Sequence, residues 1–249
     1  MSPRVTALWR HPIKSHGREA LTRARLTAGA TMPWDRTWAV AHDAARTDGT
    51  DWAPCANFSR GAKAPALMAI DATLDEAREI VTLSHPDLPD LTFQPDTDPQ
   101  ALIDWTGPLM PADRAQSARI VRVPGRGMTD TDYPSISIGN MASHRVIEAR
   151  LDQRLSEKRW RSNIWFDGMP PWEEGDWIGR TVRFGGAEIA IREAVVRCLA
   201  TTANPDTGKR DADTLSVLNE GREFCVYGEV VATGEICVHD PIEVLSRWN

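Results

Sequence analysis

Short alternations of apolar and polar residues recur along most of the chain. A period of two is typical of a strand buried on one face, and residues 20–26 show it well. Turn-forming residues, such as Asp48-Gly49, separate these stretches. We therefore expect strands at residues 4–9, 20–26, 37–42, 66–70, 79–83, 91–93, 119–123, 160–166, 181–184, 188–192, 225–231 and 236–238.

Helical periodicity is confined to two segments. Residues 99–105 suggest a short helix, and residues 141–155 a longer one that Asn140 caps at its N-terminus. One face of the longer helix carries His144, Ile147, Leu151 and Leu155. Many short strands with few helices are typical of a mainly β, barrel-like fold with peripheral helices.

Composition agrees with a folded protein of one or two units. The chain has 249 residues, of which 41% are hydrophobic and 26% charged, an ordinary globular balance. The strand pattern is weakest between residues 96 and 128. We therefore predict an N-terminal unit over residues 1–95 and a second unit over residues 96–249.

The charge and the N-terminus argue against several classes of protein. Lysine and arginine number 29 against 35 acidic residues, a net charge of −6, which disfavours a general nucleic-acid binder. No apolar run approaches the ~20 residues that a membrane span requires. The opening residues, MSPRVTALWRHPIK, lack the apolar stretch of a signal peptide. We expect a cytoplasmic protein that binds neither nucleic acid nor membrane.

The four cysteines are best interpreted one by one. They form no C-x-x-C pair and have no histidine at zinc-finger spacing, and without a secretory signal a disulfide framework is not expected. Each is by default a small buried apolar residue. Cys198 differs because Arg197 precedes it: a nearby cation lowers the pKa of a thiol, and the thiolate is both a nucleophile and a metal ligand. An inert buried thiol is the alternative.

Two segments near the N-terminus carry groups that suit an anion. Lys14 and Ser15 follow a proline that ends a strand, so they can present an ammonium and a hydroxyl group. Arg36 lies in the run WDRTW. There it either forms a structural ion pair with Asp35 or binds a phosphate with two parallel hydrogen bonds.

A third basic segment is KRWRSNI. As a strand it would place Arg159, Arg161 and Asn163 on one face, which suits an anionic ligand rich in hydrogen-bonding groups, such as a phosphorylated heterocycle. Nucleic acid is the other interpretation, and the acidic net charge weighs against it. Near the C-terminus, Tyr227 belongs to a segment that by itself predicts only a hairpin.

Taken together, these segments resemble the MOSC family, the molybdenum-cofactor sulfurase C-terminal domain, with its N-terminal β-barrel partner domain. HPIKS and WDRTWAV resemble the opening of the partner domain, and RWRSNIWFDG resembles the family's R-F-R-P-N stretch. EEGDWIGRTVRFGGAEIAI, RCLATTANPDTGKRD and TGEICVHDPIEV resemble the later segments, the second containing the cysteine motif R-C-x-x-T-T-x-x-P-D-T-G. Within the family, the chain is similar to the mitochondrial amidoxime-reducing component and its bacterial relatives.

Three positions depart from the family pattern. Ser162 replaces the proline of R-F-R-P-N, Val195 stands where some members have a second cysteine, and His239 replaces the glycine before the last Asp-Pro. None of these is the expected metal ligand. The sequence also lacks the ferredoxin-like extension of some bacterial members, which leaves the route of the electrons open.

The resemblance implies a molybdenum-cofactor (molybdopterin) oxidoreductase that reduces N-hydroxylated compounds with electrons from a separate haem, flavin or iron–sulfur protein. Cys198 would be the catalytic thiolate ligand of molybdenum, and Arg197 would favour its thiolate form. The cofactor would be held by Lys14, Ser15, Arg36, Arg161, Asn163 and Tyr227.

We expect the anion-binding residues to converge on one cleft shared by both halves of the chain. Cys198 should be reachable from it, and the other three cysteines should lie outside it. The alternatives are a sulfur carrier that uses a Cys198 persulfide, or a cofactor-binding protein without turnover.

Overall fold

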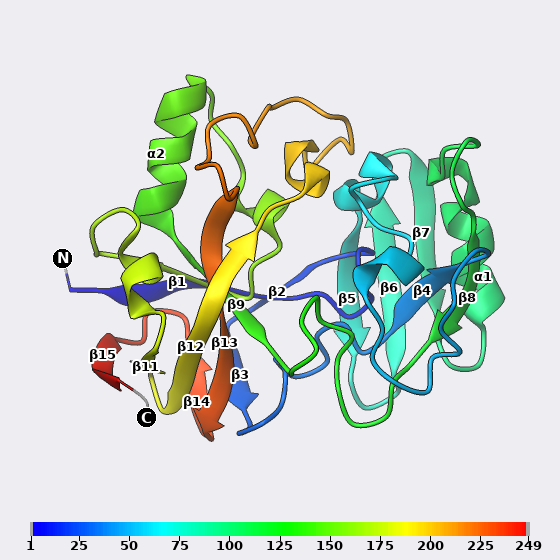
Figure 1. Cartoon of the computed structure of the whole chain (residues 1–249). Coiled ribbons are helices and arrows are strands. Elements are labelled where there is room, and N and C mark those ends of the chain that lie inside the picture. Colours follow the sequence, from blue (N-terminus) through cyan, green and yellow to red (C-terminus); the bar gives the residue numbers. More distant parts are fainter. Residues whose placement is uncertain (1, 248–249) are drawn as a thin grey trace.

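The largest feature of the fold is an eight-stranded sheet (Figure 1). The computed structural model describes residues 2–247. In spatial order the sheet contains β15 (Ile242–Arg247), β11 (Arg180–Phe184), β12 (Ala187–Val196), β13 (Glu223–Ala232), β9 (Ile136–Asn140), β10 (Ile164–Asp167), β1 (Arg4–Arg10) and β2 (Glu19–Leu21). Neighbouring strands are antiparallel except β9 and β10, which are parallel.

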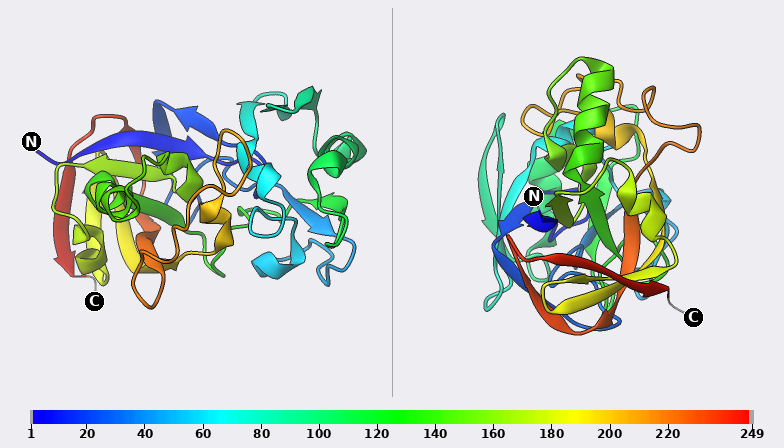
Figure 2. Two further views of the ribbon diagram at one scale, coloured as in Figure 1. Left: turned by 90° about the horizontal axis from the view of Figure 1, so that it is seen from above. Right: turned by 90° about the vertical axis from the view of Figure 1, so that its left-hand side faces the viewer.

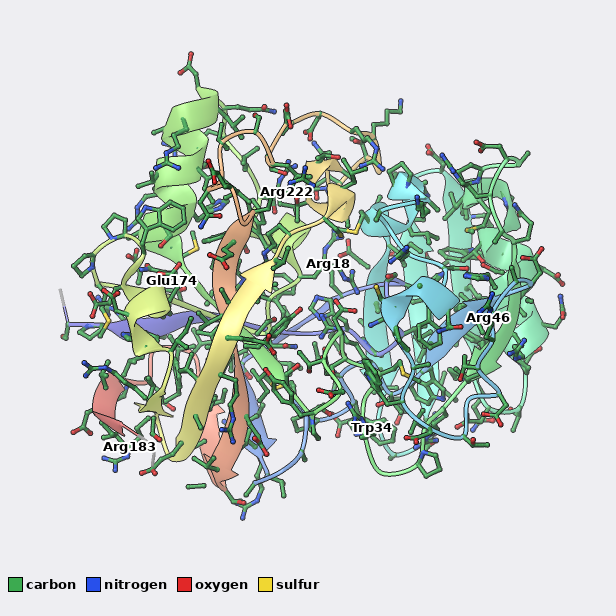
Figure 3. The ribbon with its side chains drawn as sticks, in the orientation of Figure 1. Arg18, Trp34, Arg46, Glu174, Arg183 and Arg222 are labelled. Carbon is green, nitrogen blue, oxygen red and sulfur yellow. The ribbon has the colours of Figure 1, made fainter. Side chains whose placement is uncertain are left out.

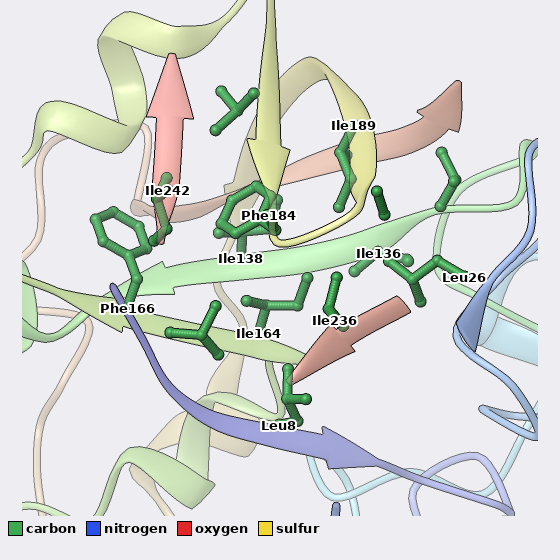
Figure 4. Packing of buried hydrophobic residues seen from close by; sticks show 14 of the residues in the cluster. Leu8, Leu26, Ile136, Ile138, Ile164, Phe166, Phe184, Ile189, Ile236 and Ile242 are labelled. Atoms are coloured by element: carbon green, nitrogen blue, oxygen red, sulfur yellow. The ribbon is translucent and has the colours of Figure 1, made fainter. Parts of the chain in front are cut away.

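The sheet curves around one apolar core (Figure 4). Strand β9 is buried along its whole length, and its isoleucines pack with those of β10 and β12. A two-stranded ribbon of β3 (Arg23–Leu26) and β14 (Gly234–Cys237) adds Leu26 and Ile236 to the same core. Burial of these side chains is the main force that holds the strands together.

Residues between β3 and β9 form a second part with its own core. Strand β4 (Ala39–His42) pairs with β8 (Ser117–Val121), and β5 (Asp71–Asp75), β6 (Ile80–His85) and β7 (Leu88–Phe93) form a three-stranded sheet. Helix α1 (Pro99–Thr106) packs on β7 and β8. This core includes Trp38, Ile70, Leu83, Phe93 and Leu102.

Helix α2 (Met141–Leu151) begins where the sequence predicts it to begin. The side-chain oxygen of Asn140 accepts a hydrogen bond from the backbone amide of Ala142, which satisfies one free donor of the first turn. The helix ends earlier than predicted because Asp152 adopts a left-handed backbone, with φ of 49°. Short 3₁₀ segments complete the fold at Cys55–Asn57, Pro65–Ala69, Gly107–Leu109, Glu157–Trp160, Glu173–Trp177 and Leu199–Thr202.

The first two strands of the sequence, β1 and β2, belong to the large sheet and precede the residues of the second part. Strand β1 pairs with β10 and β2 pairs with β1, whereas the residues that follow β3 form the other side of the molecule (Figure 2). The mainly β prediction is confirmed, and strands near residues 4–9, 79–83 and 181–184 are found where expected. The division at residue 95 stays a prediction. Within residues 2–247, no helix combines the length and apolar character needed to cross a bilayer.

Two predicted strands are wrong. Residues 66–70 lie mostly in the 3₁₀ segment Pro65–Ala69, because proline is favoured in the first turn of a helix and donates no hydrogen bond to a sheet. The segment from Trp160 is not one strand: a 3₁₀ turn ends at Trp160, Arg161 is left-handed with φ of 53°, and β10 starts only at Ile164. The basic side chains therefore do not share a strand face.

Candidate functional site

A cavity of about 560 Å³ receives side chains from both parts of the molecule. It brings together most of the residues that the sequence suggested for the site. Those that line it are Lys14, Ser15, Arg36, Arg161, Arg197, Cys198 and Tyr227. Asn163 lies behind the wall: its side-chain oxygen accepts a hydrogen bond from the backbone amide of Ser137, which does line the cavity.

Lys14 and Ser15 reach the cavity from the loop after β1. The Lys14 ammonium, only 4% exposed, donates to the carbonyl of Met128 at 2.9 Å and to Asp130 Oδ1 at 2.5 Å. Burial opposes the ionisation of Asp130, but the charges of Lys14 and Arg36 outweigh it and lower the pKa of this carboxyl to about 2. The wall therefore contains an ion pair of Lys14 and Asp130. The Lys14 ammonium can also form a hydrogen bond to an anionic ligand in the cavity.

Arg36 is paired within the protein. Its Nη1 donates to Asp35, whose carboxylate is fully buried and also accepts from the backbone amide of His11 at 2.7 Å. Burial would raise the pKa of Asp35, yet the Arg36 charge and the hydrogen bonds from His11 lower it. Arg36 Nη2 donates to the carbonyl of Arg161 at 3.2 Å. Arg36 therefore forms the structural ion pair with Asp35 and also lines the cavity.

Within the described residues, 2–247, Arg161 forms no ion pair with a carboxylate. Its Nη2 donates to the carbonyl of Gly17 at 3.1 Å, whereas its Nη1 is buried and has no hydrogen-bond partner in that part of the chain. Burial, together with the positive charges of Arg36 and Arg18, lowers the pKa of Arg161 to about 9. A buried cation next to other cations costs free energy unless an anion balances it, so this corner of the cavity is suited to an anion.

The backbone at this corner is also unusual. Ser15, Arg36 and Arg161 all have left-handed φ values, of 65°, 54° and 53°. Residues other than glycine adopt this conformation rarely, and such strain concentrates at functional sites, where the surrounding structure holds it in place. The three side chains are therefore directed by local geometry that no propensity in the sequence reveals.

Arg197 is held by the scaffold. Its guanidinium donates to the carbonyls of Phe224 and Trp160 at 2.7 and 2.8 Å, and lies 5.6 and 5.5 Å from the centres of their rings. Its backbone amide donates to the carbonyl of Arg222. These contacts fix the end of β12, from which Cys198 follows directly.

Cys198 is an exposed free thiol at the start of a 3₁₀ turn, and it lines the cavity. A residue that is both exposed and in the lining lies at the mouth. Two buried arginines hold the loop that follows. Arg159 donates to the carbonyl of Thr201 at 3.0 Å, and Arg18 donates to those of Pro205 and Met68 at 2.9 and 2.6 Å.

The prediction that the other cysteines lie outside the cleft is wrong for one of them. Cys55 lines the same cavity, and its sulfur accepts a hydrogen bond from Arg60 at 2.9 Å. No local pattern indicated this, because Cys55 comes to line this cavity only through the packing of the two parts. Cys225 is buried, which raises its pKa to about 11, and Cys237 is half-buried on β14.

Three further residues were missed or misjudged from the sequence. Asp130 and Trp52 line the cavity, but both lie between the predicted strands and carry no motif that singled them out. Arg159, expected on the same face as Arg161, lines the cavity too, yet its guanidinium is bonded to backbone carbonyls and to Asp211. Tyr227 lies in the wall, where burial and the Asp130 charge raise its pKa. Its hydroxyl therefore stays protonated at neutral pH.

Comparison with known families gives two matches that together span nearly the whole chain. Residues 2–117 match the MOSC N-terminal beta barrel domain, and residues 129–243 match the MOSC domain. The chain is 24% identical to the mitochondrial amidoxime-reducing component 1 of Mus musculus, over 98% of this chain and 82% of the relative. It is 29% identical to the mitochondrial amidoxime reducing component 2 of Homo sapiens, over 45% of this chain and 37% of the relative.

Among solved structures, the YUAD protein from Bacillus subtilis is similar over 100% of this chain and 98% of its own, with 13% identity and a TM-score of 0.49. YiiM from Escherichia coli is similar over 46% of this chain and 55% of its own, with 18% identity and a TM-score of 0.35.

Proposed function

The chain belongs to the MOSC family, and from this premise we propose that it is a molybdenum-cofactor-dependent oxidoreductase that reduces N-hydroxylated compounds. The amidoxime-reducing components to which it is similar motivate the choice of reaction. The observation that carries the proposal is the half-buried Arg161 guanidinium in the cavity wall, whose buried Nη1 has no hydrogen-bond partner among residues 2–247. It fits the phosphate of a pterin cofactor.

The residues present fit the rest of this group as well. Lys14 and Arg36 would add two charge-assisted hydrogen bonds to the phosphate or to pterin oxygens, and the Ser15 hydroxyl could donate a third. Tyr227 and the Asn163-supported strand β9 would line the pterin. Cys198, an exposed residue of the same lining, offers the soft thiolate that suits a metal such as molybdenum, and it would lose its proton on ligation.

When bound, the cofactor supplies a two-electron metal centre that can accept an oxygen atom. The overall reaction balances as R₂N–OH plus two electrons and two protons giving R₂N–H and water. The N–O bond breaks and nitrogen is reduced. The electrons would come from a separate haem, flavin or iron–sulfur protein in the cytoplasm, and the protons from solvent. The wall around Trp52 and Met68 would exclude bulk water from the substrate, because both side chains line the cavity.

The experiment is metal analysis and cofactor fluorescence on protein made in a molybdenum-replete host, followed by reduction of a test amidoxime with reduced methyl viologen. We expect molybdenum near one atom per chain, and turnover that Cys198→Ser abolishes. Cys237→Ser is the matched control, since this thiol lies on β14 outside the cavity. Bound cofactor without turnover would indicate a storage protein. A persulfide on Cys198 without molybdenum would indicate a sulfur carrier.

A further inference from the structure

A second cavity, of about 350 Å³, lies next to the first. Its volume is within the range of about 300–1,000 Å³ that is usual for small-molecule sites. Among residues 2–247, Ala194 alone lines both cavities, so the second one has its own set of side chains. They come mainly from the end of α2, from the 3₁₀ segment Glu173–Trp177 and from the start of β13. The proposed cofactor site uses none of them.

Apolar and aromatic side chains form most of the wall of the second cavity. The rings of Trp172 and Phe224 meet edge to face, with their centres 6.0 Å apart. Ile178 also lines the cavity and is 45% exposed, so it lies at the entrance. Trp172 and Cys225 both have left-handed backbones, with φ of 69° and 70°, a strain that concentrates at functional sites. The wall therefore suits a ligand with a flat apolar body.

One buried carboxylate in the lining has an oxygen without a donor. Glu174 is only 2% exposed, and its Oε2 accepts hydrogen bonds from Ser143 Oγ at 2.9 Å and Asn140 Nδ2 at 3.0 Å. Its Oε1 is buried and has no hydrogen-bond partner within residues 2–247. Figure 3 shows Glu174 at the base of helix α2, which supplies Ser143. A buried acceptor without a donor costs free energy, which a ligand that donates to Oε1 would recover.

The charge around this carboxylate favours a cation. Burial raises the pKa of Glu174, because the anion loses its water without gaining a counter-charge. Arg150 and Glu223 are the other charged residues of the lining, and the Arg150 guanidinium already donates to the carbonyl of Val217 at 2.7 Å. The lining thus has two carboxylates and one cation. The charged residues next to it in sequence are four acids and one base: Glu173, Asp176, Glu193, Glu220 and Arg222.

We infer that this cavity is a second small-molecule site, which binds a flat aromatic ligand that carries a cationic amidinium group. The aromatic ring would pack against Trp172 and Phe224, and an N–H of the amidinium would donate to Glu174 Oε1 in a charge-assisted hydrogen bond. Binding at this site does not depend on the proposed reductase activity. Reduction of an aryl amidoxime yields such an amidine, so under the proposed function this class of ligand is the enzyme's own product.

The test is a calorimetric titration of the full-length, molybdenum-free protein with benzamidine. We expect a dissociation constant of about 1 mM or lower. Benzamide and benzoate have a similar flat shape but carry no charge and a negative charge, so they should bind at least tenfold more weakly. Benzamide that binds as tightly as benzamidine would overturn the inference, and so would benzamidine that does not bind.

Matched substitutions distinguish the two cavities. Glu174→Gln keeps the shape of the side chain and removes its charge, so it should weaken benzamidine binding at least tenfold. Asp132→Asn makes the same change in the lining of the first cavity and should leave the affinity unaltered. Loss of binding in Asp132→Asn alone, or equal loss in both variants, would place the amidine in the first cavity and overturn the inference.

A second pair of variants avoids any change to the buried carboxylate. Ile178→Arg puts a cation at the entrance and should weaken benzamidine binding at least tenfold through like-charge repulsion. Val231→Arg is its control, because Val231 is also 45% exposed and lines neither cavity. Full affinity in Ile178→Arg would refute this site even if Glu174→Gln failed to fold. Because these titrations need neither molybdenum nor turnover, their failure would leave the reductase proposal standing, and absence of turnover would leave this site standing.

Discussion

Replacing Arg161 with methionine should stabilise the cofactor-free protein. The fold holds this guanidinium at a pKa of about 9 instead of 12.5, a difference that corresponds to about 5 kcal/mol at neutral pH. Water at the cavity mouth reduces this cost, and the variant leaves the Gly17 carbonyl without its donor, a loss of about 1–3 kcal/mol. We expect the free energy of unfolding to rise by about 1–2 kcal/mol, measured by urea unfolding at pH 7 and followed by tryptophan fluorescence.

The neighbouring Arg36 provides the matched control with the opposite sign. Its guanidinium is paired with the fully buried carboxylate of Asp35, so Arg36→Met leaves an uncompensated buried charge. Breaking such a pair costs about 3–5 kcal/mol. Destabilisation by Arg161→Met as large as that of Arg36→Met would refute the argument that Arg161 is an unbalanced cation.

The same argument predicts anion binding and its pH dependence. Inorganic pyrophosphate should raise the melting temperature of the wild-type protein and have no such effect on Arg161→Met. The stabilisation should weaken as the pH rises through about 9, because the Arg161 guanidinium then loses the proton that attracts the anion. Pyrophosphate stabilisation that is equal in both proteins would place the anion elsewhere.

Three other outcomes test the site and the fold. Cys198→Ser should abolish amidoxime reduction, with Cys237→Ser retaining at least half of it; full activity of the first variant would exclude metal ligation there. Arg18 joins the loop after Cys198 to the other part of the molecule through the carbonyls of Pro205 and Met68. Arg18→Ala should therefore destabilise the protein by about 3 kcal/mol and increase the rate at which iodoacetamide alkylates Cys198. Arg18→Lys should have a smaller effect on both the stability and the alkylation rate. Burial lowers the pKa of His11 and His16 to about 3 and 4, so the unfolded chain binds protons that the fold does not. Stability in urea should therefore fall as the pH drops from 6.5 towards 4, by about 1.4 kcal/mol per histidine for each pH unit, and a flat profile would contradict this.

Local patterns predicted the elements whose cause is local. Asn140 marks the start of α2 because its side chain caps the first turn, and that chemistry lies within three residues. Strand β9 was missed because it is buried on both faces and shows no alternation, as expected for a strand with a parallel neighbour. The strand placed at 66–70 was wrong because Pro65 starts a 3₁₀ turn, and the true strand is the next segment, Asp71–Asp75.

The chemistry of the cavity was only partly visible in the sequence. Residue types and the family resemblance indicated Cys198 and the basic set, and the fold places nearly all of them around one cavity. The pairing of Lys14 with Asp130 joins residues 116 positions apart, and the entry of Cys55 depends on how the two parts pack. Contacts between residues this far apart produce no periodic pattern in the sequence, so they can be identified only in the folded structure.

The position of β1 in the large sheet delays the completion of that sheet during synthesis of the chain. This strand is made first, yet its partner β10 emerges from the ribosome roughly 150 residues later, which takes on the order of 10–30 s at ordinary rates of translation. Throughout that interval an apolar strand has an edge without a partner, and the intervening part can fold beforehand on its own core. The nascent chain therefore passes through a stage in which the second part can be folded while β1 is still without its partner β10. A chaperone that covers exposed strands would act at that stage.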